Sequence, residues 1–267
     1  MLEMLSHGFM ARAFMAGAII GALCAVVSVF IVLKKISFIG VGVSHSAFGG
    51  VAIGALLGVN LTVSVFVFST FVALLIGWLS RRSGAHEDIS IGVVFSSSMA
   101  LGVVALGLME GYNIDMFSFL FGSILAVSNA DLWVALGALL FVTLVIAILF
   151  KELLAYCFDE QWARVCGINV NRLQDTLLVL IAVTVVVSIK LLGIILVSAL
   201  LVMPGAIGHT LAENYRGQFV ISILSALASV FTGLTLSYYF DIASGATIVL
   251  SSAFLFLLAT IFSRKVY

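Results

Sequence analysis

The residue best suited to chemistry in this sequence is His45, which lies within a long apolar stretch, Phe38–Gly58. An ionisable side chain deep in an apolar segment is costly and usually faces a partner or a pathway. A neutral imidazole is also a common ligand of divalent transition metals. His45 is therefore a candidate metal ligand, and a structural hydrogen-bonding role is the alternative.

The other histidines give weaker signals. His209 and Glu213 are four residues apart, so a helix would place them on one face, where they fit a polar exit lining or an interfacial pair better than a metal site. His86-Glu87-Asp88 lacks the second histidine of a zinc-protease helix and predicts a solvated turn. His7 lies in the N-terminal tail and is interpreted as incidental.

The elements that position these residues follow from the composition. Hydrophobic residues make up 63% of the 267 positions, charged residues make up 9%, and there is one proline. Apolar blocks of about 20 residues match the hydrocarbon thickness of a bilayer, and helix satisfies the backbone polar groups inside each block. The sequence therefore predicts an all-α, polytopic transmembrane bundle of eight or nine spans in a single domain, residues 1–267. The blocks are Phe14–Leu33, Phe38–Gly58, Thr62–Leu79, Ile89–Met109, Leu132–Phe150, Leu173–Ile189, Leu191–Leu211, Phe219–Tyr239 and Ala243–Phe262.

Two segments depart from a regular span. The seventh block contains Pro204 beside Gly205, which predicts a broken or re-entrant helix. The piece Met116–Ser128 is apolar but too short to cross, so we expect it at the interface or packed against the bundle.

The basic residues predict the orientation. If all nine blocks cross and the C-terminus is cytoplasmic, ten of the twelve lysines and arginines lie inside, and only Arg12 and Lys190 lie outside. The outer face then has five acids against two bases, a net charge of −3. This asymmetry reflects the positive-inside rule alone or, in addition, a mild attraction for cations. The acids are Glu3, Glu110, Asp115, Asp131 and Asp241.

Several classes of protein are disfavoured. The three cysteines, Cys24, Cys157 and Cys166, form no CxxC pair and imply no disulfide framework. A net charge of zero without a basic tract argues against a nucleic-acid partner. Lys34-Lys35 follows the first block at the place where a signal-peptide cleavage site would need small residues, so the first block is not interpreted as a signal peptide.

One connection between the spans is long, from about residue 151 to 172. Asp159 is expected to cap a short helix and Gly167 to end it. Phe158 and Trp162 would be exposed on this amphipathic element. Such exposure favours docking of a cytoplasmic partner over a plain surface linker.

Several segments, in this order, resemble the membrane subunit of ABC-type importers for zinc, manganese or iron, a family related in fold to the permeases for vitamin B12 and iron-siderophores. They run along nearly the whole chain. They are Leu33-Lys34-Lys35, Ser44-His45-Ser46-Ala47, Ile89–Ser96, Leu120–Leu125, Phe158–Gly167, Gly193–Pro204 and Ser237–Gly245.

The resemblance implies a type II ABC importer permease in the bacterial cytoplasmic membrane. It implies a homodimer with a translocation path along its axis, and an extracytoplasmic metal-binding protein that delivers the ion. It also implies a cytoplasmic ATP-binding subunit docked at Phe158, Asp159, Trp162, Arg164 and Gly167. The sequence has no G-x-x-x-x-G-K-[ST] loop, so ATP hydrolysis is expected on that separate subunit and no resident cofactor is expected here.

The sequence departs from the family pattern at one position. The family places an aspartate four residues before the histidine of the second span, and Val41 stands there. A site with fewer carboxylates favours Zn²⁺ over Mn²⁺, because manganese prefers oxygen ligands. The sequence therefore predicts ATP-driven import of a divalent transition metal, with zinc first and manganese or iron as alternatives.

Two other functions compete with this prediction. A stand-alone secondary cation transporter or channel would not need an ATPase, but spans two to five contain no charged residue for ion coupling. An intramembrane enzyme finds less support, because there is no Gly-x-Ser-x-Gly serine and no pair of aspartates in facing spans.

Overall fold

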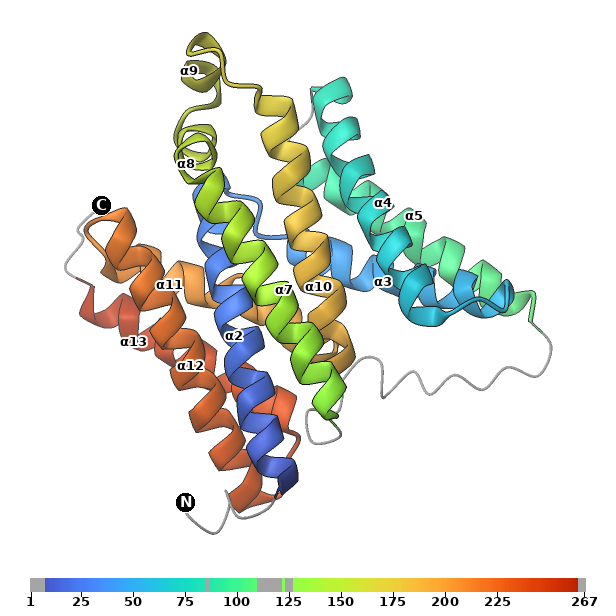
Figure 1. Cartoon of the computed structure of the whole chain (residues 1–267), viewed down its shortest axis with the longest axis vertical. Coiled ribbons are helices and arrows are strands. Elements are labelled where there is room, and N and C mark those ends of the chain that lie inside the picture. The colour runs from blue at the N-terminus through green and yellow to red at the C-terminus, as the bar shows by residue number, and fades with distance from the viewer. Residues whose placement is uncertain (1–7, 85–86, 110–121, 123–126, 264–267) are drawn as a thin grey trace. The chain divides into compact units, whose positions relative to one another are not determined.

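The computed structural model describes residues 8–84, 87–109, 122 and 127–263, and the regular structure in these residues is entirely helical (Figure 1). The expected all-α bundle is confirmed. The described helices are α2 (Gly8–Lys34), α3 (Ile39–Leu56), α4 (Leu61–Ser83), α5 (Glu87–Gly107), α7 (Asn129–Ile148), α8 (Phe150–Phe158), α9 (Glu160–Val165), α10 (Val170–Leu200), α11 (Met203–Leu211), α12 (Tyr215–Phe240) and α13 (Ser244–Phe262).

Eight candidate spans satisfy the length and hydropathy of a membrane crossing within the described residues. Seven of them coincide with predicted blocks to within a few residues. The eighth is the run Val170–Leu211, which contains both the sixth and the seventh block. His7, His86 and most of Met116–Ser128 lie outside the described residues.

The chain divides into two compact units, and the division falls inside α10. Unit 1 comprises residues 1–35, 117–150 and 187–267, and therefore contains α2, α7, the end of α10, α11, α12 and α13. Unit 2 comprises residues 36–116 and 151–186, and contains α3, α4, α5, α9, most of α8 and the first part of α10.

In unit 1, α2 runs antiparallel to α12. The ring of Phe14 stacks on that of Phe231 with 5.3 Å between centroids, whereas Phe30 meets Phe219 at 5.5 Å. The later residue of α2 thus contacts the earlier residue of α12, which is why the two helices run in opposite directions. Gly21 lets the two helices approach closely, since a Cβ there would lie 3.4 Å from Val230. This is the small-residue packing expected of membrane helices.

The seventh block is broken, as predicted, and it crosses the length of unit 1. Gly193 has φ 78° and ψ 166°, a conformation that only glycine adopts readily. Just before it, Lys190 pairs with Asp131 at the start of α7, with Nζ and Oδ1 2.7 Å apart. After it, the Thr210 carbonyl at the end of α11 accepts from the hydroxyl of Ser263, past the end of α13. The segment from Gly193 to Leu211 thus runs from the end of unit 1 at Asp131 to the end at Ser263.

The same contacts define two ends of unit 1. Arg12 donates to the Val127 carbonyl at 3.1 Å, beside the start of α7, so the beginning of α2 lies with Lys190 and Asp131. The end of α13 lies with Thr210 at the opposite end. Helix α2 therefore begins at one end of unit 1, and α13 finishes at the opposite end.

In unit 2, α3 packs against both α4 and α5 through its glycines. A Cβ on Gly50 would lie 3.0 Å from the Cα of Val65, and a Cβ on Gly42 would lie 2.6 Å from Ile91. Gly50 and Gly54, four residues apart, both lie at close contacts with α4. Gly58 follows the end of α3 with φ 66°, and a Cβ there would meet no described atom, so this glycine ends the helix and takes no part in the packing.

Candidate functional site

The imidazole of His45 is half-buried on α3 and held by its own helix. Its Nδ1 lies 3.1 Å from the carbonyl oxygen of Val41, one turn earlier. A carbonyl only accepts, so Nδ1 carries the proton and donates. The ring edge meets Phe95 of α5, with 5.6 Å between centroids and 89° between planes. Nε2 is then the nitrogen with a free lone pair, which is the form of histidine that binds metals.

One imidazole does not make a metal centre. Among the described residues there is no group of three or more histidine, cysteine, aspartate or glutamate side chains placed to hold an ion. At the position of the family aspartate, the side chain of Val41 offers no ligand and only its backbone carbonyl is used. A transient site at His45 therefore needs ligands from elsewhere.

A second candidate site is the pair of short helices α8 and α9. The carboxylate of Asp159 accepts from the Trp162 amide at 2.9 Å and caps α9, and Gly167 ends the element with φ 81°. Both predictions are confirmed. Phe158 and Trp162 are 68% and 59% exposed, as expected, and Val165 is 87% exposed.

Val165 was missed by the sequence reasoning. Trp162 and Val165 are three residues apart on α9 and share a helical face, whereas Phe158 ends α8, just before the extended backbone of Asp159. The pattern could have been found in the sequence. We call these three side chains the docking stripe.

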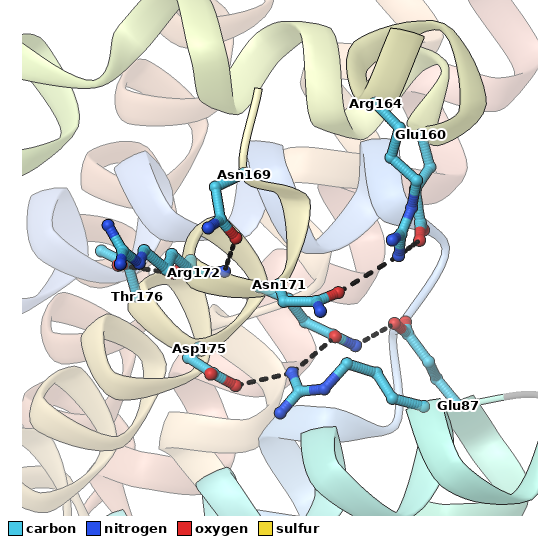
Figure 2. A network of polar contacts seen from close by, with 10 residues as sticks. Glu87, Glu160, Arg164, Asn169, Asn171, Arg172, Asp175 and Thr176 are labelled. Carbon is cyan, nitrogen blue, oxygen red and sulfur yellow. Dashed lines mark hydrogen bonds and ion pairs between the residues drawn. The ribbon is translucent and has the colours of Figure 1, made fainter. Parts of the chain in front are cut away.

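Arg164 makes contacts within the chain that the sequence did not indicate. Its Nη2 donates to Glu160 Oε1 at 2.9 Å and to Asn171 Oδ1 at 3.2 Å, so it joins α9 to the start of α10 (Figure 2). The guanidinium is thereby committed to contacts within the chain. Its assignment to the ATPase interface stays a prediction.

Beside this link lies a polar network that the sequence did not suggest. Arg81 at the end of α4 donates to Gln174 Oε1 at 2.8 Å and to Asp175 Oδ1 at 2.6 Å (Figure 2). Gln174 Nε2 donates to Glu87 Oε1 at 2.8 Å, in the first turn of α5. We call these four residues the Arg81 network.

Tyr156 of α8 lies next to the Arg81 network. It is 1% exposed and lines a small cavity together with Glu87 and Gln174. Burial, with the nearby charges of Glu87 and Glu160, raises the pKa of the Tyr156 phenol above its ordinary value. The phenol is therefore neutral at physiological pH and adds no charge to the network.

His209 and Glu213 do not share a helix face, so this prediction is wrong. His209 lies in the last turn of α11, which ends at Leu211. Ala212 leaves the helix with ψ 142°, and Glu213 lies in the bend before α12. The cause is Ala212, whose extended backbone breaks the four-residue spacing. A role of either residue in lining an exit stays a prediction.

Comparison with known proteins gives one family. Residues 6–263 match the model of the ABC 3 transport family. A manganese transport system membrane protein, MntC of Halalkalibacterium halodurans, is 35% identical and covers 98% of this chain and 90% of the relative. MntB of Synechocystis, also a manganese transport system membrane protein, is 34% identical and covers 99% of this chain and 86% of the relative. A probable iron transport system membrane protein of Haemophilus influenzae is 34% identical and covers 99% of this chain and 97% of the relative.

A solved structure agrees in fold. PsaBC from Streptococcus pneumoniae, in complex with Fab, superposes with a TM-score of 0.86 and 31% identity, covering 99% of this chain and 95% of that chain. An inward-facing metal-chelate type ABC transporter has a TM-score of 0.74 at 18% identity, covering 94% and 85%, and supports the fold alone.

Proposed function

The chain belongs to the ABC 3 transport family, and from that membership we propose that it is the permease subunit of an ATP-driven importer of divalent transition metals. Manganese is the first cargo, because relatives at 34–35% identity over nearly the whole chain are named for manganese transport. Iron follows from the Haemophilus relative. The preference for zinc rests on Val41 alone and stays a prediction.

The observation that carries this proposal at the level of chemistry is the geometry of His45. Its Nδ1–H is fixed on the Val41 carbonyl, which leaves Nε2 to meet a passing ion. A backbone partner on the other ring nitrogen is the usual way in which a metal-binding imidazole is oriented. In a homodimer, the second copy of the chain would supply a second His45, and the path would lie between the copies.

Energy for transport would come from a cytoplasmic ATP-binding subunit. The docking stripe supports this, because Phe158, Trp162 and Val165 are exposed apolar side chains on the short helices α8 and α9, outside the candidate spans. Such exposure is typical of a protein contact. The chain itself has no phosphate-binding glycine loop with a lysine.

The orientation follows from the two ends of unit 1. Lys34, Lys35 and Arg216 belong to the end at which α13 finishes, whereas Asp131 and Asp241 belong to the end with Arg12 and Lys190. The end richer in basic residues is expected in the cytoplasm. The C-terminus is therefore cytoplasmic, and an extracytoplasmic metal-binding protein delivers ions to the opposite, more acidic end.

The test is uptake into vesicles that contain this chain and its ATPase. We expect ATP-dependent accumulation of Mn²⁺, with competition by Zn²⁺ and Fe²⁺ ranking the cargoes. His45→Ala should reduce uptake by about tenfold or more while the complex still assembles, as loss of an oriented metal ligand does. Ser46→Ala, at a buried neighbouring hydroxyl of α3, is the matched control and should retain uptake. Metal accumulation by the chain without any ATPase would instead indicate a secondary carrier.

A further inference from the structure

A buried glutamine joins three helices of unit 2. Gln174 of α10 is 9% exposed; its Oε1 accepts from Arg81 of α4, and its Nε2 donates to Glu87 of α5, both at 2.8 Å (Figure 2). A guanidinium only donates and a carboxylate only accepts, so the group between them must both accept and donate, as the Gln174 amide does. Leucine or glutamate at this position would break one bond or both.

Two contacts lead toward the Arg81 network from α8 and α9, the helices that carry the docking stripe. Arg164 of α9 is bonded to Asn171, three residues before Gln174 on the same helix. Tyr156 of α8 lines the same cavity as Gln174 and Glu87. A displacement of α8 and α9 by a bound partner would therefore act on the first turns of α10 and on the network.

The network reaches His45 along one face of α5. Glu87, Ile91 and Phe95 follow each other at four-residue spacing, so they point the same way. Glu87 holds Gln174, Ile91 lies against Gly42, and Phe95 meets the His45 ring at 5.6 Å. Because α3 and α5 are in close contact at Gly42, we expect a movement of α5 to displace α3 and the His45 side chain that it carries.

We propose that Gln174 is a positioning residue for transport: it fastens α10 to α5, so that movement of the docking helices is passed along α5 to the His45 side chain. The inference rests on the proposed function, because it assumes that ATP hydrolysis by a docked subunit drives metal past His45. Gln174 touches neither metal nor nucleotide in this role. It acts by keeping two helices in step.

A purely structural role is the competing explanation. A fastening that only stabilises the fold would, when cut, reduce assembly, ATP hydrolysis and uptake together. A coupling residue has a different signature, because the complex would still assemble and hydrolyse ATP while fewer ions move per ATP. The ratio of metal taken up to ATP hydrolysed is therefore the decisive measurement.

The experiment uses the full complex in vesicles, with Mn²⁺ as the probe. Gln174→Leu removes both hydrogen bonds. Gln174→Glu places a carboxylate beside Glu87, and the double variant Gln174→Glu with Glu87→Gln exchanges the two groups, which restores donors, acceptors and net charge. Thr176→Val is the control, since the Thr176 hydroxyl bonds only to the Arg172 carbonyl of its own helix, at 2.8 Å.

We expect Gln174→Leu and Gln174→Glu to lower the ratio of Mn²⁺ to ATP by at least about fivefold, the lower limit of a typical coupling between sites. The double variant should return to within about twofold of the unmodified chain, since exchanged partners restore an interaction in a mutant cycle. Thr176→Val should not change the ratio.

Three results would overturn the inference. One is an unchanged ratio in either single variant. Another is a double variant that assembles but whose ratio of Mn²⁺ to ATP is no higher than that of Gln174→Glu. The third is loss of assembly in both single variants, with or without recovery in the double variant, which would make the role structural. Absence of ATP-driven Mn²⁺ uptake with the unmodified chain is a separate result, and it would contradict the proposed function itself.

Discussion

At the scale of single residues, position 41 decides how His45 meets an ion. The side chain there is apolar, and the backbone carbonyl alone orients the imidazole. The nitrogen that remains is a ligand suited to several divalent metals. Cargo preference is therefore expected to respond to a change at position 41 more than to changes elsewhere on α3.

Val41→Asp should shift the cargo toward manganese. A carboxylate one turn before His45 adds a hard oxygen ligand, which Mn²⁺ favours more than Zn²⁺ does. We expect the ratio of Mn²⁺ to Zn²⁺ uptake under competition to rise by about tenfold, as for one ligand of a metal site. Val41→Asn introduces a side chain of nearly the same shape as aspartate but without the charge, and it should change the ratio less. An equal shift in both variants would argue against a ligand role for the carboxylate.

Gly193→Ala should destabilise the protein. The backbone of Gly193 has φ 78° and ψ 166°, a region that costs a residue with a side chain about 1–3 kcal/mol. Thermal unfolding in detergent should show a lower midpoint. Gly137→Ala on α7 is the control, because a Cβ there meets nothing and alanine is the better helix former. A midpoint unchanged by Gly193→Ala would show that the turn relaxes.

At the scale of elements, much of the structure could be predicted from local sequence. The spans follow from runs of apolar residues, and the short helix α9 follows from a capping aspartate and a terminating glycine. These signals lie within one helix turn of the feature they specify. The failure at His209 and Glu213 is local as well: Ala212 leaves the helix without proline, glycine or a polar cap to mark the change.

The Arg81 network could not be predicted in this way. Arg81 and Gln174 are 93 positions apart, and nothing near either residue indicates the other. Their pairing depends on how α4 and α10 pack, which is a property of the tertiary structure. The same holds for the edge contact of His45 with Phe95.

The docking stripe gives a prediction at this scale. Trp162→Asp with Val165→Asp should reduce binding of the ATPase by about a hundredfold or more, since buried aromatic anchors commonly contribute 2 kcal/mol or more each. Pull-down or titration with the purified ATPase measures it. Val59→Asp changes an equally apolar residue, 51% exposed, in the turn between α3 and α4, and should leave binding intact. Full binding by the double variant would place the ATPase elsewhere.

At the scale of the whole molecule, the first question is which side faces the cytoplasm. Cys166 is exposed at the end of α9, whereas Cys24 and Cys157 are buried. A membrane-impermeant thiol reagent should label Cys166 in inside-out vesicles and not in right-side-out vesicles. Ala130→Cys, at an exposed position in the first turn of α7, should show the reverse when Cys166 is replaced by serine. Labelling of Cys166 from the outside would invert the proposed orientation.

On the proposed path, His45 is the one imidazole that each copy of the chain would offer to an ion. A site with so few ligands would hold an ion briefly and distinguish poorly between similar cations. We therefore expect the cargo to be selected before it reaches the membrane, by the proposed extracytoplasmic metal-binding protein. Exchanging that capturing protein should change what the cell accumulates more than exchanging this one.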